Sequence, residues 1–109
     1  MKKRAIFTAL IALGLFSTAA NADIKKGQKV YLKKCKTCHG NGTKGAAMKT
    51  QKEWAAAFEN DAKIFRDWHK NDKKAMKYID SSKFKKDAPN LKDFLYEYGS
   101  DSGNVPSCS

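Results

Sequence analysis

Cysteine, histidine and proline are scarce in this 109-residue sequence, which contains three, two and two of them. Outside its first 22 residues no apolar run approaches the about 20 residues that span a bilayer. Alternating runs typical of β-strands, internal repeats and low-complexity segments are also missing. Acidic residues are few, 11 against 22 lysines and arginines. These absences exclude a repeat protein and argue against a β-sheet fold or a membrane span beyond the N-terminus.

The first 22 residues have the pattern of a secretory signal peptide. Residues 2–4 are basic, residues 5–16 are apolar, and residues 20–22 read Ala-Asn-Ala, which fits the A-x-A cleavage pattern. A membrane anchor is the alternative, but the apolar run is shorter than the about 20 residues that a span needs. We therefore expect cleavage after Ala22, export to the periplasm, and no transmembrane anchor in the mature chain, residues 23–109.

The mature chain is small and strongly basic. Cleavage leaves 87 of the 109 residues and removes three basic residues, so the formal charge falls from +11 to +8. A domain of this size buries a limited core and commonly depends on a disulfide, a metal or another covalent link. Export argues against a nucleic-acid partner, and the lysines are spread along the chain. The charge therefore indicates either an acidic protein partner or a role in solubility alone.

One short segment concentrates most of the metal-binding residue types. Cys35-Lys36-Thr37-Cys38-His39 is a C-x-x-C-H sequence, the attachment pattern of a c-type haem. Two thiols three residues apart can both reach the vinyl side of one porphyrin, and the adjacent imidazole can bind the iron. The sequence therefore predicts one haem c, bound covalently by Cys35 and Cys38, with His39 as the proximal iron ligand.

Two other kinds of site use a C-x-x-C pair. A thioredoxin-like redox centre belongs to a βαβ pattern, and the chain has no strand-like run that would build one. A structural zinc site needs four ligands, and no second pair of ligands at suitable spacing follows. Both remain alternatives to the haem, which the pattern favours.

The residues around this motif resemble the class I cytochromes c, the small monohaem electron carriers. Residues 24–34 predict a helix with Gly27 and Tyr31 on one stripe. A glycine inside a helix costs about 1 kcal/mol relative to alanine, so close approach of another helix is its expected reason. In this family a glycine and an aromatic residue four positions later meet the C-terminal helix. The resemblance implies an all-α, cytochrome c-like fold in which the N- and C-terminal helices cross and short middle helices surround the haem.

Three further helices are predicted after the motif. Thr50 and Glu53 form a capping box that opens one, and Asp61 is expected to cap the next. The C-terminal helix is predicted to begin at Asp87-Ala88-Pro89 and to end near Gly99. We expect the tail, residues 100–109, to be mobile.

The residue at the sixth iron position is open to three candidates. Met76 resembles the family's segment that delivers a methionine to the distal face, and we take it as the expected ligand. Residues 75–79 can instead form a helix in which Met76 is part of the core. His69 would give a bis-histidine haem, although its position among polar residues favours a surface role. Met48 follows the motif by nine residues and is interpreted as packing beside the haem.

The resemblance implies a periplasmic one-electron carrier of the respiratory chain rather than an enzyme. Its expected partners are acidic redox proteins such as an oxidase, a peroxidase or a cytochrome bc-type donor. The alternatives are a five-coordinate haem protein that binds or senses a gas, and a small haem subunit of a larger redox enzyme. Cys108 is left over after haem attachment, and we expect a monomer rather than a disulfide-linked dimer.

Overall fold

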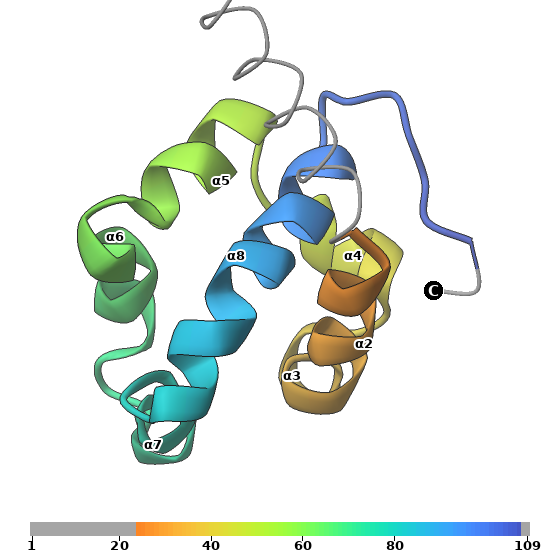
Figure 1. Ribbon diagram of the computed structural model, residues 1–109. Helices are drawn as coiled ribbons and strands as arrows, with labels where there is room; N and C mark the ends of the chain where they lie inside the picture. Colours follow the sequence, from red (N-terminus) through yellow and green to blue (C-terminus); the bar gives the residue numbers. More distant parts are fainter. Residues whose placement is uncertain (1–23, 108–109) are drawn as a thin grey trace, which may run out of the picture.

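The computed structural model describes residues 24–107, and within them every regular element of secondary structure is a helix (Figure 1). The helices are α2 (Ile24–Lys34), α3 (Lys36–His39), α4 (Gly42–Ala46), α5 (Gln51–Ala57), α6 (Glu59–His69), α7 (Lys73–Ile79) and α8 (Ser82–Glu97). The all-α fold class is confirmed. None of the described helices is long and apolar enough to cross a membrane. The predicted signal peptide, residues 1–22, and Cys108 lie outside the described residues.

The first and last described helices pack directly against each other, as predicted. In Figure 1, α8 runs through the middle of the molecule with α2 beside it. A methyl group on Gly27 would lie 2.7 Å from the carbonyl carbon of Asn90 and 2.8 Å from Cβ of Phe94. Real Cβ atoms do not come so close to backbone, so only glycine permits this crossing. The predicted reason for a glycine inside α2 is therefore confirmed.

The C-terminal helix begins earlier than its sequence indicates. The predicted start at Asp87 is wrong, because α8 begins at Ser82. The side chain of Ser81 caps it by accepting the backbone N–H of Phe84 at 3.3 Å. The Phe84 side chain is buried, so the extra turns are held against the core. Pro89 lies inside the helix and has no backbone N–H to donate. Its position is exposed, so water can bind the carbonyl that would otherwise accept this N–H.

The capping box of α5 is confirmed. Thr50 accepts the backbone N–H of Glu53 at 3.2 Å, and the Glu53 carboxylate accepts that of Thr50 at 2.9 Å. These bonds satisfy two N–H groups that a helix start leaves free. One residue further on, Trp54 is buried, and its indole N–H donates to the Ala46 carbonyl at 2.8 Å. The cap therefore fixes the position from which Trp54 joins α5 to α4.

The start of α6 differs from the prediction. Asp61 does not cap a helix; residues 60–62 have left-handed backbone angles, with φ between 54° and 58°. Arg66 holds this turn, since its Nε donates to the Asp61 carbonyl at 2.9 Å and its Nη1 to Asp80 at 2.7 Å. Left-handed residues other than glycine cost energy, so such a turn depends on surrounding contacts. A side chain five residues later supplies one of them.

The final described residues lie along the helices. The N–H of Ser100 donates to the Lys49 carbonyl at 3.0 Å, and Asp101 accepts the N–H of Gln51 at 2.9 Å. Gln28 donates to the Ser107 carbonyl at 2.8 Å. These bonds join the last residues to α2 and α5. The mobility expected of residues 100–109 stays a prediction.

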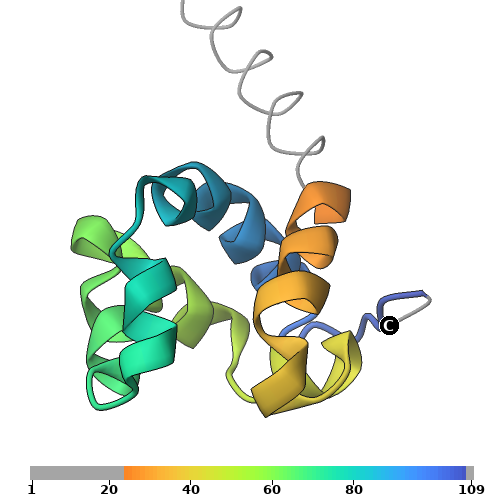
Figure 2. The same ribbon diagram turned by 90° about the horizontal axis from the view of Figure 1, so that it is seen from below.

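Two groups of helices face each other across the centre of the molecule. Figure 2 shows α2 and α3 on one side and α6 and α7 on the other, with α8 behind them. The aromatic core lies along this boundary, and Phe65 of α6 stacks on Phe84 of α8 with ring centroids 5.6 Å apart. The C-x-x-C-H segment lies at the same boundary, because α3 follows α2 directly.

Candidate functional site

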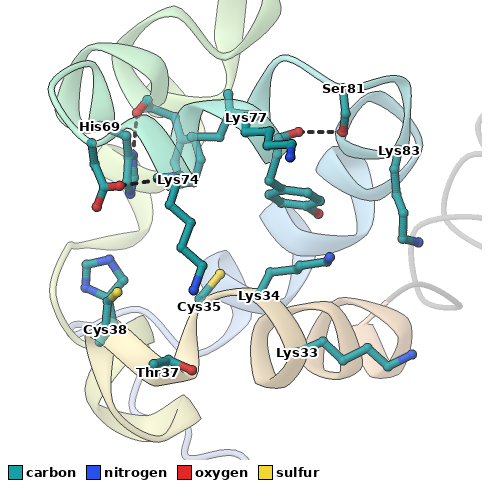
Figure 3. Close-up of a pocket in the computed structure, with 16 residues that line it drawn as sticks. Lys33, Lys34, Cys35, Thr37, Cys38, His69, Lys74, Lys77, Ser81 and Lys83 are labelled. Atoms are coloured by element: carbon teal, nitrogen blue, oxygen red, sulfur yellow. Dashed lines mark hydrogen bonds between the residues drawn. The ribbon is translucent and has the colours of Figure 1, made fainter.

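The C-x-x-C-H segment forms a single helical turn at the end of α2. The N–H of Cys35 donates to the Tyr31 carbonyl at 2.8 Å, and that of His39 donates to the Cys35 carbonyl at 3.0 Å. Figure 3 shows the sulfur atoms of Cys35 and Cys38 directed toward one cavity, with His69 on its opposite side. Burial, and then the nearby charge of Cys38, raise the pKa of the Cys35 thiol to about 12. Both predicted attachment residues therefore face the same space.

Tyr31 holds the chain that follows His39. Its hydroxyl donates to the carbonyls of Gly40 at 2.8 Å and Asn41 at 3.1 Å. Its ring is 2% exposed and lies 5.6 Å from that of Phe94, so the hydroxyl is positioned by the crossing of α2 and α8. Burial raises the pKa of the Tyr31 hydroxyl to about 12, with a smaller contribution from the charge of Cys35. This aromatic residue therefore links the helix crossing to the backbone beside the imidazole.

Two adjoining cavities open at the boundary between the two groups of helices. Their volumes are about 520 Å³ and 370 Å³. The larger reaches along α2, α7 and the start of α8, and the smaller reaches Trp54 and Trp68 on one side and Leu91 and Leu95 of α8 on the other. Six residues line both cavities: Cys35, Cys38, His39, Phe65, His69 and Asp72. The cavities are thus two halves of one cleft with a shared centre.

The two described histidines face each other at that centre. The ring centroids of His39 and His69 are 6.0 Å apart, and the ring planes are nearly perpendicular at 88°. Burial, and then the nearby charge of His69, lower the pKa of His39 and favour its neutral form. Nδ1 of His69 lies 2.8 Å from the carbonyl oxygen of Phe65. A neutral imidazole that donates from Nδ1 to this carbonyl keeps the lone pair of Nε2 for a metal.

The two methionine candidates lie differently. Met76 is in the middle of α7, half-buried, and packs against the hydrophobic core. Neither cavity is lined by Met76, although its neighbours Ala75 and Lys77 line the larger one. Met48 lines the smaller cavity and is 46% exposed. The structure thus brings His69 opposite the proximal candidate and places Met76 in a helix against the core, as in the helical alternative for residues 75–79.

Lysines surround the opening of the larger cavity. Figure 3 shows Lys33 and Lys34 on the side of α2, and Lys74, Lys77 and Lys83 on the opposite side. The Lys34 ammonium lies 5.0 Å from the centre of the Tyr78 ring, a distance at which cation and ring attract. The cleft therefore has a positively charged rim.

Sequence reasoning missed two features of this rim. Lys83 reaches the cavity only because α8 begins at Ser82 rather than at the predicted position. Tyr78 lines the same cavity, and its hydroxyl donates to the buried carboxylate of Asp87 at 2.6 Å. Burial, and then this hydrogen bond, raise the pKa of Tyr78. The cap at Ser81 was the signal in the sequence that could have located the helix start.

A thioredoxin-like centre and a structural zinc site, the two alternatives to a haem, would each need features of their own. The described residues contain no β-strand from which a thioredoxin-like site would be built. Within the same residues, no group of three or more histidine, cysteine, aspartate or glutamate side chains could hold a metal ion. The donors that are present suit a haem: two thiols and one imidazole along a cleft whose centre they share.

Comparison with known proteins places the chain in a family. Residues 22–95, about two thirds of the chain, match the family model described as cytochrome c oxidase, cbb3-type, subunit III. No curated protein and no solved structure matches significantly. The family match implies a covalently bound haem c and a role in electron transfer. This chain therefore belongs to the family of the cbb3-type cytochrome c oxidase subunit III, and it is a c-type cytochrome.

Proposed function

We propose that this protein is an exported class I cytochrome c with one haem. It transfers single electrons between respiratory proteins in the periplasm. One observation supports this most strongly: a single cleft contains both thiols of the C-x-x-C-H motif and has a rim of lysines. Bound haem supplies reversible one-electron chemistry at its iron. No acid, base or nucleophile of the protein is needed for such a transfer.

Each residue of the motif has a distinct task in this proposal. Cys35 and Cys38 would hold the haem through thioether bonds, and His39 would bind its iron. Tyr31 fixes the backbone after His39 through its two hydrogen bonds to carbonyls. Phe65 and the apolar residues of α8 exclude water from the cleft. The match between donors and cleft supports haem attachment at these positions.

The lysine rim suits docking of an acidic protein. Opposite charges steer two proteins together before they touch, and this attraction weakens as salt is added. An acidic oxidase, a peroxidase or a cytochrome bc-type donor would therefore bind over the larger cavity, where Lys34, Lys77 and Lys83 are gathered. Transfer through this face keeps the path between the haem and its partner short.

Charge reversal tests the docking face. Lys77→Glu changes a lysine of the rim, and Lys52→Glu makes the same change in net charge on α5, where the lysine lines neither cavity. We expect the rate of electron transfer to an acidic oxidase to fall several-fold for the first variant and much less for the second. The difference should shrink as salt rises from about 0.01 to 0.15 M, where the Debye length falls from about 30 to 8 Å. Equal effects of both variants, or rates independent of salt, would contradict docking at the rim.

The description of the family favours a second candidate. It names a subunit of an oxidase, which supports permanent attachment of this chain to a larger redox enzyme. The basic rim would then be part of a stable interface. Size-exclusion chromatography of a native extract separates the two proposals: a free carrier elutes at the size of the mature chain, and a subunit elutes with its complex. The remaining alternative, a five-coordinate gas-binding haem, requires that the reduced protein bind carbon monoxide.

A further inference from the structure

The positions of the two histidines carry an inference about the iron itself. His39 comes from α3 and His69 from the last turn of α6, and 30 residues separate them in the chain. The fold nevertheless brings their rings to 6.0 Å between centroids, at the centre shared by both cavities. Their placement on opposite sides of this cleft needs a reason beyond local sequence.

The separation agrees with two imidazoles on one metal ion. A metal–imidazole bond is about 2 Å long, and the ring centre lies about 1 Å beyond the bound nitrogen. Two imidazoles on opposite faces of one ion therefore have centroids about 6 Å apart. An edge-to-face contact between rings also falls in the range of about 4.5–7 Å. The distance is thus compatible with shared coordination, which two further features of the site favour.

The hydrogen bond of His69 is the first of these. With Nδ1 bonded to the Phe65 carbonyl at 2.8 Å, the ring orientation is fixed and the tautomer that carries a free Nε2 is favoured. The ring also contacts that of Phe65, with centroids 4.6 Å apart, and Phe65 is buried. Metal-binding histidines are commonly held by such a bond from the other ring nitrogen to a carbonyl.

The cleft supplies the second observation. A macrocycle bound through its central iron extends on both sides of the axis between its two ligands. The cavities of about 520 Å³ and 370 Å³ both have His39 and His69 in their walls. The space that a planar group needs is therefore continuous with the gap between the rings. A simple contact between two surface histidines would not require two cavities that both reach the pair.

The methionine is held away from this centre. The N–H of Met76 donates to the Asp72 carbonyl at 2.9 Å, and its own carbonyl accepts the N–H of Asp80 at 2.8 Å. The Asp72 side chain caps α7 by accepting the N–H of Ala75 at 3.0 Å. For Met76 to reach the cleft, α7 would have to unwind or rotate and lose these bonds and the packing of Met76 on the core.

We propose that His69, rather than Met76, is the distal ligand, so that two histidines bind the haem iron. This inference rests on the proposed function, because it requires haem c at Cys35, Cys38 and His39. A thioether ligand raises the potential of a haem, and an imidazole in its place leaves it lower. Bis-histidine ligation therefore makes this carrier suited to partners of lower potential than a histidine–methionine carrier would serve. It also closes the iron to gases, which separates it from the five-coordinate alternative.

Spectroscopy of the unaltered holoprotein tests the ligand without any variant. We expect the oxidised protein to lack the weak near-infrared sulfur-to-iron band. Its electron paramagnetic resonance spectrum should be low-spin and strongly anisotropic, because the ring planes are nearly perpendicular. A sulfur-to-iron band in this protein, lost in Met76→Leu or in Met48→Leu, would overturn the proposal and assign the ligand to that methionine.

Variants give a second, independent reading. His69→Ala should convert the iron to a form whose reduced state binds carbon monoxide, and added imidazole should restore the low-spin spectrum. Met76→Leu is the matched control and should keep the spectrum and the closed site of the unaltered protein. A His69→Ala protein that stays low-spin and closed to carbon monoxide would refute the assignment. Absence of haem c from the unaltered protein, measured as its pyridine haemochrome and its mass, would instead refute the proposed function.

Discussion

The crossing of α2 and α8 leads to a quantitative prediction for Gly27→Ala. The new methyl group would lie 2.7 Å from the Asn90 carbonyl carbon and 2.8 Å from Phe94 Cβ, and closer still to the Asn90 oxygen. Because the main obstacle is backbone, α8 must move away from α2, and such overpacking costs about 3 kcal/mol at the upper end of its usual range. Alanine returns about 1 kcal/mol through its higher helix propensity. We therefore expect Gly27→Ala to lower the free energy of unfolding by about 2 kcal/mol.

Thermal unfolding measures this loss. For a domain of about 60–100 residues, 1 kcal/mol shifts the Tm by about 4–8 °C, so Gly27→Ala should lower the Tm of the holoprotein by about 8–16 °C. The control uses Lys29, an exposed position of the same helix. There Lys29→Ala should be about 1 kcal/mol more stable than Lys29→Gly, which isolates the helix propensity. If Gly27→Ala melts at or above the temperature of the unaltered protein, the close helix crossing is wrong.

Four further predictions concern the site and the ends of the chain. Tyr31→Phe should cost about 1–2 kcal/mol at neutral pH, because two carbonyls lose their donor. Burial raises the pKa of the Tyr31 hydroxyl from 10 to about 12. The neutral hydroxyl therefore stabilises the fold fully below pH 10, and this contribution is lost as the pH rises toward 12. Between these two pH values, the free energy of unfolding of Tyr31→Phe should depend less on pH than that of the unaltered protein. Cys35→Ala or Cys38→Ala should yield little normal holoprotein and a largely unfolded apoprotein, and a well-folded, haem-free variant with native helix content in circular dichroism would contradict this. N-terminal sequencing of periplasmic protein should begin at Asp23, and an uncleaved chain would refute the signal peptide. Non-reducing electrophoresis should show a monomer, and a dominant reducible dimer would assign a disulfide to Cys108.

The features that the sequence predicted correctly depend on residues close together in the chain. The helix over residues 24–34 follows from the spacing of residues along one stripe, and the capping box needs only Thr50 and Glu53. Gly27 indicated a helix crossing because its cost in a helix has to be offset by something outside the helix. The all-α class follows from the same local signals, since helices form their hydrogen bonds within one segment.

The start of α8 shows where local signals compete. Pro89 in a first turn and Ser81 as a cap are both valid helix starts in the sequence. The burial of Phe84 decides between them, because it stabilises the extra turns against Phe65 of α6. The turn before α6 is similar, since Arg66 holds it by binding Asp80, the residue that follows α7. Neither contact is visible before the helices are placed in space.

By itself, the sequence determined the helix over residues 24–34, the capping box of α5 and the motif in which Cys35, Cys38 and His39 stand together, because those signals act over a few residues. Only the tertiary structure decided what faces His39. In the sequence His69 is a histidine among polar residues, and Met76 follows a polar turn that resembles a family pattern. Packing of α6 against the aromatic core turns His69 into the cleft, and the same core holds Met76 outside it. Which residue lies opposite His39 depends on how α6 and α7 pack, and that packing is a property of the whole core.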